Sequence, residues 1–185
     1  MMKKIIQPDK FTPSDGIAPA RKPRPVSVLL DNIRSLYNVG SIFRTSDAAG
    51  IEKIYLCGIT GRPPRAEIHK AALGAETVVP WEYQEDSLAV IKKLKASGYR
   101  IVVLEHTDSG KDYSTAEYSF PLCLVIGHEI TGISDAVVAE ADAAIEIPMA
   151  GMKQSLNVAV AYGIAIFEVI RHHESSSKTA PSRSR

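Results

Sequence analysis

Three short segments rich in small and polar residues are candidates for ligand chemistry, because each follows an apolar run typical of a buried strand. They cover residues 105–108, 127–134 and 148–155. Glycines let backbone amides and carbonyls approach a ligand closely, and ligands of parallel sheets bind at the carboxyl ends of strands. Each segment alone also fits ordinary turn chemistry. None has the spacing of a dinucleotide fingerprint or a phosphate-binding P-loop.

A fourth segment, residues 32–49, places an asparagine and an arginine on a predicted helix. Asn38 is expected to cap this helix, which continues to about Ala49 and ends at Gly50. Its apolar and small residues share one face, and Arg44 lies roughly opposite that face. The residues of the face are Val39, Ile42, Phe43, Ser46 and Ala49. From periodicity alone, a capped surface helix with an exposed arginine is the favoured interpretation.

The elements that must position these segments alternate between strand and helix. Strands are expected at residues 26–30, 53–57, 77–80, 100–104, 122–126 and 144–147, and helices at 38–49, 66–73, 87–97, 134–141 and 156–170. This alternation predicts an α/β fold with a mostly parallel sheet and helices on both faces.

The last predicted helix has no charged residue between Leu156 and Phe167. Its apolar and small residues surround the helix axis, which is typical of a helix buried on every side. A chain this short has little domain to cover such a helix, so the pattern predicts a homodimer. The alternative is a central helix packed inside a monomer.

Length and composition favour one globular domain. The chain has 185 residues, of which 45% are hydrophobic and 23% charged. It has no apolar run that would cross a membrane or form a signal peptide, so a cytoplasmic protein without a membrane partner is expected. Cys57 and Cys123 lie in apolar strand-like runs and are expected to be buried free thiols. No Cys/His spacing matches a metal site, so no metal is expected.

The two ends of the chain carry most of its positive charge. Residues 1–25 hold six basic and two acidic groups and five prolines, which predicts an extended basic arm. Residues 173–185 are expected to form a disordered basic tail after a domain at 26–172. Basic ends on an acidic centre indicate a polyanion partner, although short basic tails also occur merely for solubility.

Taken together, the segments resemble the SpoU-type (TrmH-type) family of RNA ribose 2′-O-methyltransferases, within the SPOUT class. Residues 38–45 (NVGSIFRT) look like its first motif. Residues 124–129 (LVIGHE), with Gly132 and Ser134, look like its second. Residues 147–149 (IPM) and 155–159 (SLNVA) look like its third. The resemblance covers about residues 26 to 171.

The resemblance implies a fold feature that periodicity does not predict. In this family the sheet ends in a deep C-terminal trefoil knot whose loops hold S-adenosyl-L-methionine, whereas chains in general almost never knot. The family is also dimeric through helices of the knot region, in agreement with the apolar last helix.

The resemblance also assigns residues. Positions matching the cofactor contacts, largely made through backbone, are Gly127, Ile147 and Leu156. The residues expected to line the same pocket are Met149 and the turn of Leu104, Glu105 and His106. Arg44 matches the catalytic arginine, and the polar active-site positions are Asn38, Glu129, Ser155 and Asn157. His128 and Lys153 are treated as variable loop residues.

The expected reaction requires a ribose hydroxyl to lose its proton, and the resemblance implies that Arg44 is the base. Arginine stays protonated, with a pKa above about 12. Two versions therefore stay open. A strongly perturbed Arg44 takes the proton, or the Arg44 cation stabilises the developing alkoxide while the proton passes to phosphate or water. Glu129 would pair with Arg44 or anchor the knot.

The remaining polar residues have two interpretations each. Asn38 and Asn157 would orient the ribose or Arg44, and Ser155 would bind the loop backbone or the substrate. Loop capping is the alternative for each of them.

Two other functions compete with this one. A non-catalytic RNA-binding protein on a methyltransferase fold would share the resemblance without the chemistry. A nucleotide-binding oxidoreductase fits the alternating pattern but lacks the glycine fingerprint. The RNA is expected to be tRNA or rRNA, with tRNA slightly favoured because the chain is compact.

Overall fold

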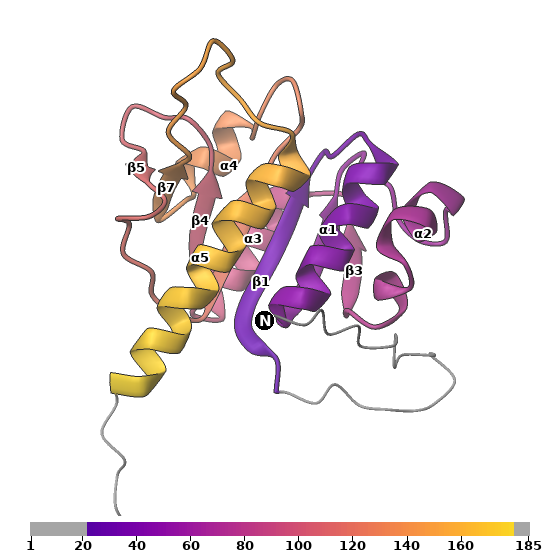
Figure 1. Cartoon of the computed structure of the whole chain (residues 1–185), viewed down its shortest axis with the longest axis horizontal. Helices are drawn as coiled ribbons and strands as arrows, with labels where there is room; N and C mark the ends of the chain where they lie inside the picture. Colours follow the sequence, from indigo (N-terminus) through magenta and orange to yellow (C-terminus); the bar gives the residue numbers. More distant parts are fainter. Residues whose placement is uncertain (1–21, 180–185) are drawn as a thin grey trace, which may run out of the picture.

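The computed structural model of the protein describes residues 22–179, which form one seven-stranded sheet flanked by helices (Figure 1). All strand pairs are parallel, and the order across the sheet is β3-β2-β1-β6-β4-β7-β5. The strands are β1 (Arg24–Asp31), β2 (Ile51–Cys57), β3 (Trp81–Gln84), β4 (Arg100–Leu104), β5 (Lys111–Asp112), β6 (Leu122–Ile126) and β7 (Ala143–Glu146).

Helices cover both faces of the sheet. One face packs against α1 (Leu36–Ala49), α2 (Ala66–Ala72) and α5 (Val158–Thr179), and the other against α3 (Ser87–Ala96) and α4 (Asp135–Ala139). Figure 1 shows α1 and α5 side by side across β1. The predicted α/β class, with a parallel sheet between two helical layers, is confirmed. The trefoil knot stays a prediction.

Helix α1 buries the face that its periodicity predicts, with Val39, Ile42, Phe43, Ser46 and Ala49 inside the core. Its expected cap is wrong, however. Ser35 is the N-cap, and its hydroxyl accepts a hydrogen bond from the Asn38 N–H at 3.3 Å. Serine and asparagine have similar N-cap preference, so the earlier of the two starts the helix and Asn38 lies in its first turn. Gly50 ends the helix with φ +61°.

Helix α5 begins later and ends later than expected. The Asn157 side chain caps it by accepting hydrogen bonds from Ala159 N–H (3.0 Å) and Val160 N–H (3.3 Å). The helix continues to Thr179, so the tail predicted from residue 173 is helical to that point. An ion pair from Glu174 to Arg24 holds this end to β1. Residues 1–21 of the predicted arm, and 180–185 of the tail, lie outside the described residues.

One face of α5 is not covered within the described chain. Tyr162, Ala165, Ile166 and Val169 are buried against the sheet and α1. Val160, Ile164 and Phe167 are 52%, 36% and 51% exposed. These three residues form an exposed stripe, so the described part of one subunit does not cover α5 on every side. The predicted homodimer, in which a second subunit covers this helix, stays a prediction.

One smaller expectation also changed. The strand predicted at residues 77–80 is replaced by a 3-10 turn, η2 (Ala75–Thr77), and by β3 starting after Pro80. Proline has no N–H to donate, so Pro80 enters the ladder only as an acceptor, from Ile54 N–H at 2.9 Å. Both cysteines are buried and free, as expected.

Candidate functional site

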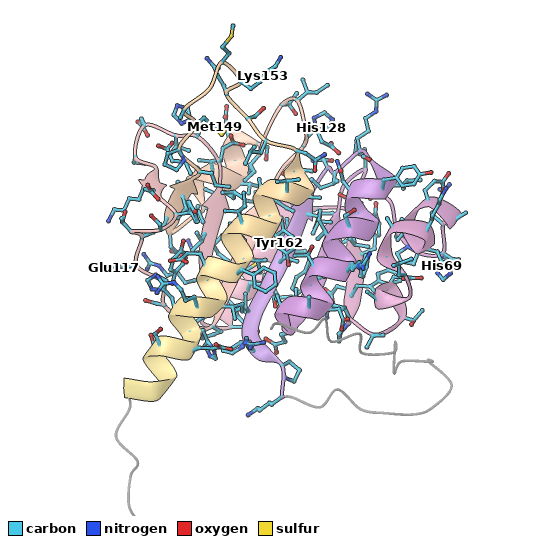
Figure 2. The ribbon with its side chains drawn as sticks, viewed as in Figure 1. His69, Glu117, His128, Met149, Lys153 and Tyr162 are labelled. Atoms are coloured by element: carbon cyan, nitrogen blue, oxygen red, sulfur yellow. The ribbon has the colours of Figure 1, made fainter. Side chains whose placement is uncertain are left out.

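A pocket of about 510 Å³ lies beyond the carboxyl ends of β4, β6 and β7 and is lined on one side by the loop that leads into α5. Figure 2 labels His128, Met149 and Lys153 at this end of the molecule. The residues predicted to bind the cofactor or to line its pocket all line it: Leu104, Glu105, His106, Gly127, Ile147, Met149 and Leu156. Three segments far apart in sequence therefore form one small-molecule site of ordinary size.

Two glycines allow the loop at residues 127–134, which follows β6, to fold tightly beside this pocket. A Cβ atom on Gly127 would lie 2.5 Å from the backbone of both Gly132 and Ile133. Gly132 has φ +68°, a left-handed conformation that favours glycine, and a Cβ there would lie 2.4 Å from the Glu105 carboxylate. That carboxylate in turn accepts a hydrogen bond from Ile133 N–H at 3.0 Å. Glu105 thus braces the loop whose backbone lines the pocket.

The Glu129 carboxylate joins this loop to the start of α1. It accepts hydrogen bonds from the backbone N–H groups of Arg34 and Ser35, each at 3.0 Å. The Asn38 side-chain amide donates a third, also at 3.0 Å. Of the two roles expected for Glu129, the structure shows an anchor between segments. The other role, pairing with Arg44, stays a prediction, because no hydrogen bond or ion pair joins the two side chains within residues 22–179.

These donors set the charge state of Glu129. Partial burial acts to raise the pKa of its carboxyl, but the hydrogen bonds from backbone N–H groups and from Asn38 favour the carboxylate. The net effect is a pKa below the ordinary value. Glu129 therefore remains a fixed anion at the rim of the pocket.

A relay of two amides extends this network to the third motif. The Asn157 amide donates to the Asn38 side-chain oxygen at 3.1 Å, while Asn38 donates to Glu129. The same Asn157 caps α5 through its own oxygen. Three of the predicted polar residues are thus in direct contact. The fourth, Ser155, lines the pocket.

Arg44 stands apart from this network. Its side chain is exposed on the outer face of α1, as the periodicity predicts, and it does not line the pocket. Along α1 it is about 9 Å from Asn38, given a rise of about 1.5 Å per residue. Within residues 22–179 its guanidinium makes no hydrogen bond or ion pair. It is available to bind an anionic group from outside the chain.

Two residues of the site were not identified from the sequence. Glu146 lines the pocket, and its carboxylate accepts a hydrogen bond from His106 Nδ1 at 2.6 Å. It is the last residue of β7, so the rule that ligands bind at the carboxyl ends of strands would have found it. Arg34 contributes its backbone N–H to Glu129, for which the sequence holds no local signal.

The lining indicates the kind of ligand that fits. Apolar side chains and glycine backbone stand beside the carboxylates of Glu105, Glu129 and Glu146. A partly apolar molecule carrying positive charge suits such walls. Within residues 22–179, no three His, Cys, Asp or Glu side chains are grouped to hold a metal ion. Over the same residues, no helix has the length and apolar character to span a membrane.

Comparison with known sequences gives a family for this arrangement. A profile of the SpoU rRNA Methylase family matches residues 25–167. A tRNA (guanosine(18)-2′-O)-methyltransferase of Escherichia coli (strain K12) is 31% identical over 157 residues, which are 85% of this chain and 68% of that protein. The enzyme of the same description from Thermus thermophilus is 32% identical over 151 residues, which are 82% of this chain and 77% of that protein.

Solved structures agree with the sequence comparison. The crystal structure of a TrmH/SpoU tRNA modifying enzyme from A. aeolicus superposes with a TM-score of 0.76 at 31% identity, covering 87% of this chain and 82% of that one. An AdoMet-bound rRNA methyltransferase from Sinorhizobium meliloti superposes with a TM-score of 0.75 at 36% identity, covering 84% of this chain and 59% of that one.

Proposed function

The chain belongs to the SpoU rRNA methylase family, and we propose from this membership how its residues carry out the reaction. The protein is an RNA methyltransferase that uses S-adenosylmethionine to methylate a ribose 2′-hydroxyl. The observation that carries this function is the pocket that collects all the predicted cofactor residues at the carboxyl ends of three strands.

The pocket walls suit this cofactor chemically. When bound there, S-adenosylmethionine supplies an electrophilic methyl group on its sulfonium. The backbone around Gly127, Ile147 and Leu156 would hold the cofactor, and Leu104 and Met149 would provide apolar contact. The carboxylates of Glu105 and Glu146 at the same walls complement a cationic ligand.

Arg44 is the residue that binds the substrate next to the reacting oxygen. An exposed guanidinium with free donors binds phosphate with paired hydrogen bonds. Of the two mechanisms, exposure of Arg44 favours the one in which its cation holds the phosphate beside the target ribose and stabilises the developing alkoxide. The hydroxyl proton then passes to that phosphate or to water.

The hydrogen bonds that link Asn157, Asn38 and Glu129 hold the three motifs at fixed positions relative to one another. They fix the start of α1 and the start of α5 relative to the loop after β6. Since Arg44 is on α1 and the cofactor pocket is built by the two loops, this relay sets the distance between substrate and methyl donor. Asn38 binds Glu129, which lines the pocket, so Asn38 and Asn157 would also orient the ribose. Ser155 faces the same substrate.

The protein acts as a homodimer. The exposed stripe of Val160, Ile164 and Phe167 is an apolar surface on an otherwise packed helix. Exposed apolar area of this kind on a soluble domain marks an interaction surface. A second copy packed on the stripe would complete the burial that the composition of α5 predicts.

The substrate is tRNA or rRNA, with tRNA preferred. Support for tRNA comes from relatives described as tRNA (guanosine(18)-2′-O)-methyltransferases, whereas a structural neighbour is described as an rRNA methyltransferase. No metal takes part in the proposed chemistry.

The function is tested by transfer of labelled methyl groups from S-adenosylmethionine to RNA. Label should enter RNA and should be lost when the target nucleotide is replaced by its 2′-deoxy form. The non-catalytic alternative predicts RNA binding with no incorporation. Calorimetry separates the two further, because a folded protein that does not bind S-adenosylmethionine would favour the non-catalytic alternative.

A further inference from the structure

A second pocket, of about 610 Å³, lies beside α2, the 3-10 turn η2 and the start of β3. Its lining residues are Pro63, Pro64, Arg65, Ala66, His69, Glu76, Thr77 and Trp81. None of them lines the cofactor pocket. In Figure 2, His69 marks this side of the molecule, away from His128 and Met149 at the carboxyl ends of the strands. The proposed methylation reaction gives no role to this second pocket.

Glu76 is the unusual residue of the second pocket. Its side chain is only 7% exposed. One carboxylate oxygen, Oε1, accepts a hydrogen bond from His69 Nδ1 at 2.5 Å. The other, Oε2, is buried and has no hydrogen-bond partner among the described residues. A buried carboxylate oxygen without a donor is costly, so the pocket favours a ligand that brings N–H groups.

The walls around this carboxylate are mostly apolar and can accept a flat ring. Trp81 is half-buried, and Pro63 and Pro64 line the pocket just before the start of α2. Aromatic side chains are the usual surfaces on which unpaired nucleobases stack. His69, whose ring binds Glu76 Oε1, has a side chain 73% exposed, so rotation of this ring would open that oxygen to a ligand at the cost of one hydrogen bond.

Basic side chains line the second pocket and follow one another along the same segment. Arg65 and His69 line the pocket and are exposed, and Arg62 and Lys70 are exposed at neighbouring positions in the sequence. The Arg62 guanidinium lies over the Tyr83 ring, 4.2 Å from its centroid. Basic groups around an apolar slot suit a phosphodiester chain that places one base inside.

We propose that this second pocket binds one unpaired base of the substrate RNA, away from the methylated nucleotide. The base uses N–H donors of its Watson–Crick edge to bind Glu76, with guanine the best fit because its N1–H and 2-amino groups are adjacent. Arg65 and Lys70 bind the flanking phosphates. This inference rests on RNA being the substrate, but the site it describes is separate from the cofactor pocket.

A metal ion is a poorer occupant of the second pocket. A hard cation needs several oxygen ligands, and within residues 22–179 no group of three candidate ligands is present. A cationic side chain from another protein would also satisfy Glu76. The basic side chains that line the second pocket repel it, however, and attract a polyanion.

Binding in the second pocket can be followed through the fluorescence of Trp81, because Trp81 is the only tryptophan in the sequence and it lines this pocket. Its fluorescence is followed while guanosine 5′-monophosphate is added to the full-length protein. We expect a saturable change. Inosine 5′-monophosphate, which lacks the 2-amino group, should bind about tenfold more weakly. The Glu76→Gln variant should bind guanosine 5′-monophosphate at least about tenfold more weakly than the unmodified protein.

Two matched variants complete the test. Glu67→Gln removes a carboxylate of α2 that does not line the second pocket, and it should leave the fluorescence titration unchanged. Arg65→Ala, at an exposed position, should weaken binding of a short single-stranded RNA without risk to the fold. Calorimetry with S-adenosylmethionine confirms for each variant that the fold and the cofactor pocket are intact.

Three results would overturn this proposal. One is the absence of any saturable change with nucleotide in a protein that still methylates RNA. Another is an unchanged affinity in Glu76→Gln. The third is a saturable response to arginine amide together with none to nucleotides, which would assign the pocket to a cationic side chain. In each case the methylation assay stands independently, so failure here is distinguishable from failure of the proposed function.

Discussion

Arg44 is the single residue on which the proposed chemistry depends most, because it combines an exposed guanidinium with a position on the same helix as Asn38. Replacing Arg44 with lysine keeps the charge but removes the planar pair of donors. We expect the rate of methyl transfer in single-turnover reactions to fall by at least about 100-fold, comparable to loss of one donor to a developing oxyanion.

The affinity of Arg44→Lys for S-adenosylmethionine should be unchanged, since Arg44 does not line the pocket. Arg171→Lys, another exposed arginine that lies near the far end of α5, serves as the control and should retain activity. Substantial activity in Arg44→Lys would show that paired hydrogen bonds from a guanidinium are not needed.

Glu129 should make stability depend on pH in the acidic range. Its carboxyl has a lowered pKa in the folded protein, so it contributes stability above its unfolded pKa of about 4.3. That contribution is lost as the pH falls through the lower folded value. Glu129→Gln should therefore reduce the free energy of unfolding at pH 7 by about 1 kcal/mol, a modest value because solvent reaches the site.

The difference between the unmodified protein and Glu129→Gln should shrink in denaturant titrations repeated at successively lower pH, as the pH falls through the unfolded pKa of about 4.3 and then through the lower folded pKa. Glu117→Gln, at an exposed carboxylate without a hydrogen bond among the described residues, is the control. Equal pH dependence in Glu129→Gln and in the unmodified protein would contradict the anchoring role.

At the scale of elements, the loop after β6 offers a paired test of pocket geometry. A Cβ on Gly127 would meet backbone atoms at 2.5 Å, whereas a Cβ on Gly151 would meet nothing within 4 Å. Both glycines line the cofactor pocket. Gly127→Ala must displace the loop, so we expect affinity for S-adenosylmethionine to fall by about 100-fold or more in calorimetry.

Gly151→Ala should bind S-adenosylmethionine almost as well as the unmodified protein. Circular dichroism shows whether Gly127→Ala remains folded, and loss of the fold would also agree with a backbone clash. Tight binding of the cofactor by a folded Gly127→Ala protein would contradict the assignment of this loop.

Features of an element that depend only on residues close together in sequence could be predicted. The buried face of α1 follows from helical spacing alone, because Val39, Ile42, Phe43, Ser46 and Ala49 recur with its period. The N-cap of α1 could not be predicted, because Ser35 and Asn38 have similar preferences for an N-cap position. Only the packed structure shows that Ser35 is the cap.

Contacts between residues far apart in the sequence also could not be predicted from local sequence patterns. The bonds of Glu129 to Arg34 and Asn38 join segments more than 90 residues apart, and no periodicity reports them. Strand-end loops indicated where a ligand binds, while the identity of each site residue came from the family resemblance. The second pocket matches no known motif, because its lining residues are brought together by the turn between α2 and β3.

At the scale of the whole molecule, the exposed stripe on α5 tests the proposed dimer. Phe167→Glu places a charge on this apolar surface, where burial against a second copy would be costly. We expect the variant to sediment as a monomer at concentrations where the unmodified protein is a dimer. Ile59→Glu, at an exposed apolar residue outside α5, should leave the dimer intact. A Phe167→Glu dimer of unchanged affinity would exclude this surface as the interface.

The path of the chain through the fold is the feature that sequence physics predicts least. Alternating strands and helices predict a parallel sheet with helices on both faces, and the structure confirms it. A knot has no signature in periodicity, and the general rule argues against one. The trefoil knot therefore rests on the family resemblance and stays a prediction.

The most direct test of the central claim is a map of 2′-O-methylated nucleotides in RNA incubated with the purified protein and S-adenosylmethionine. We predict that one nucleotide becomes resistant to alkaline cleavage at its 3′ phosphate, only when both protein and cofactor are present, and not with Arg44→Ala. Methylation of a base instead of a ribose, or no new methylated nucleotide in either tRNA or rRNA, would contradict the account.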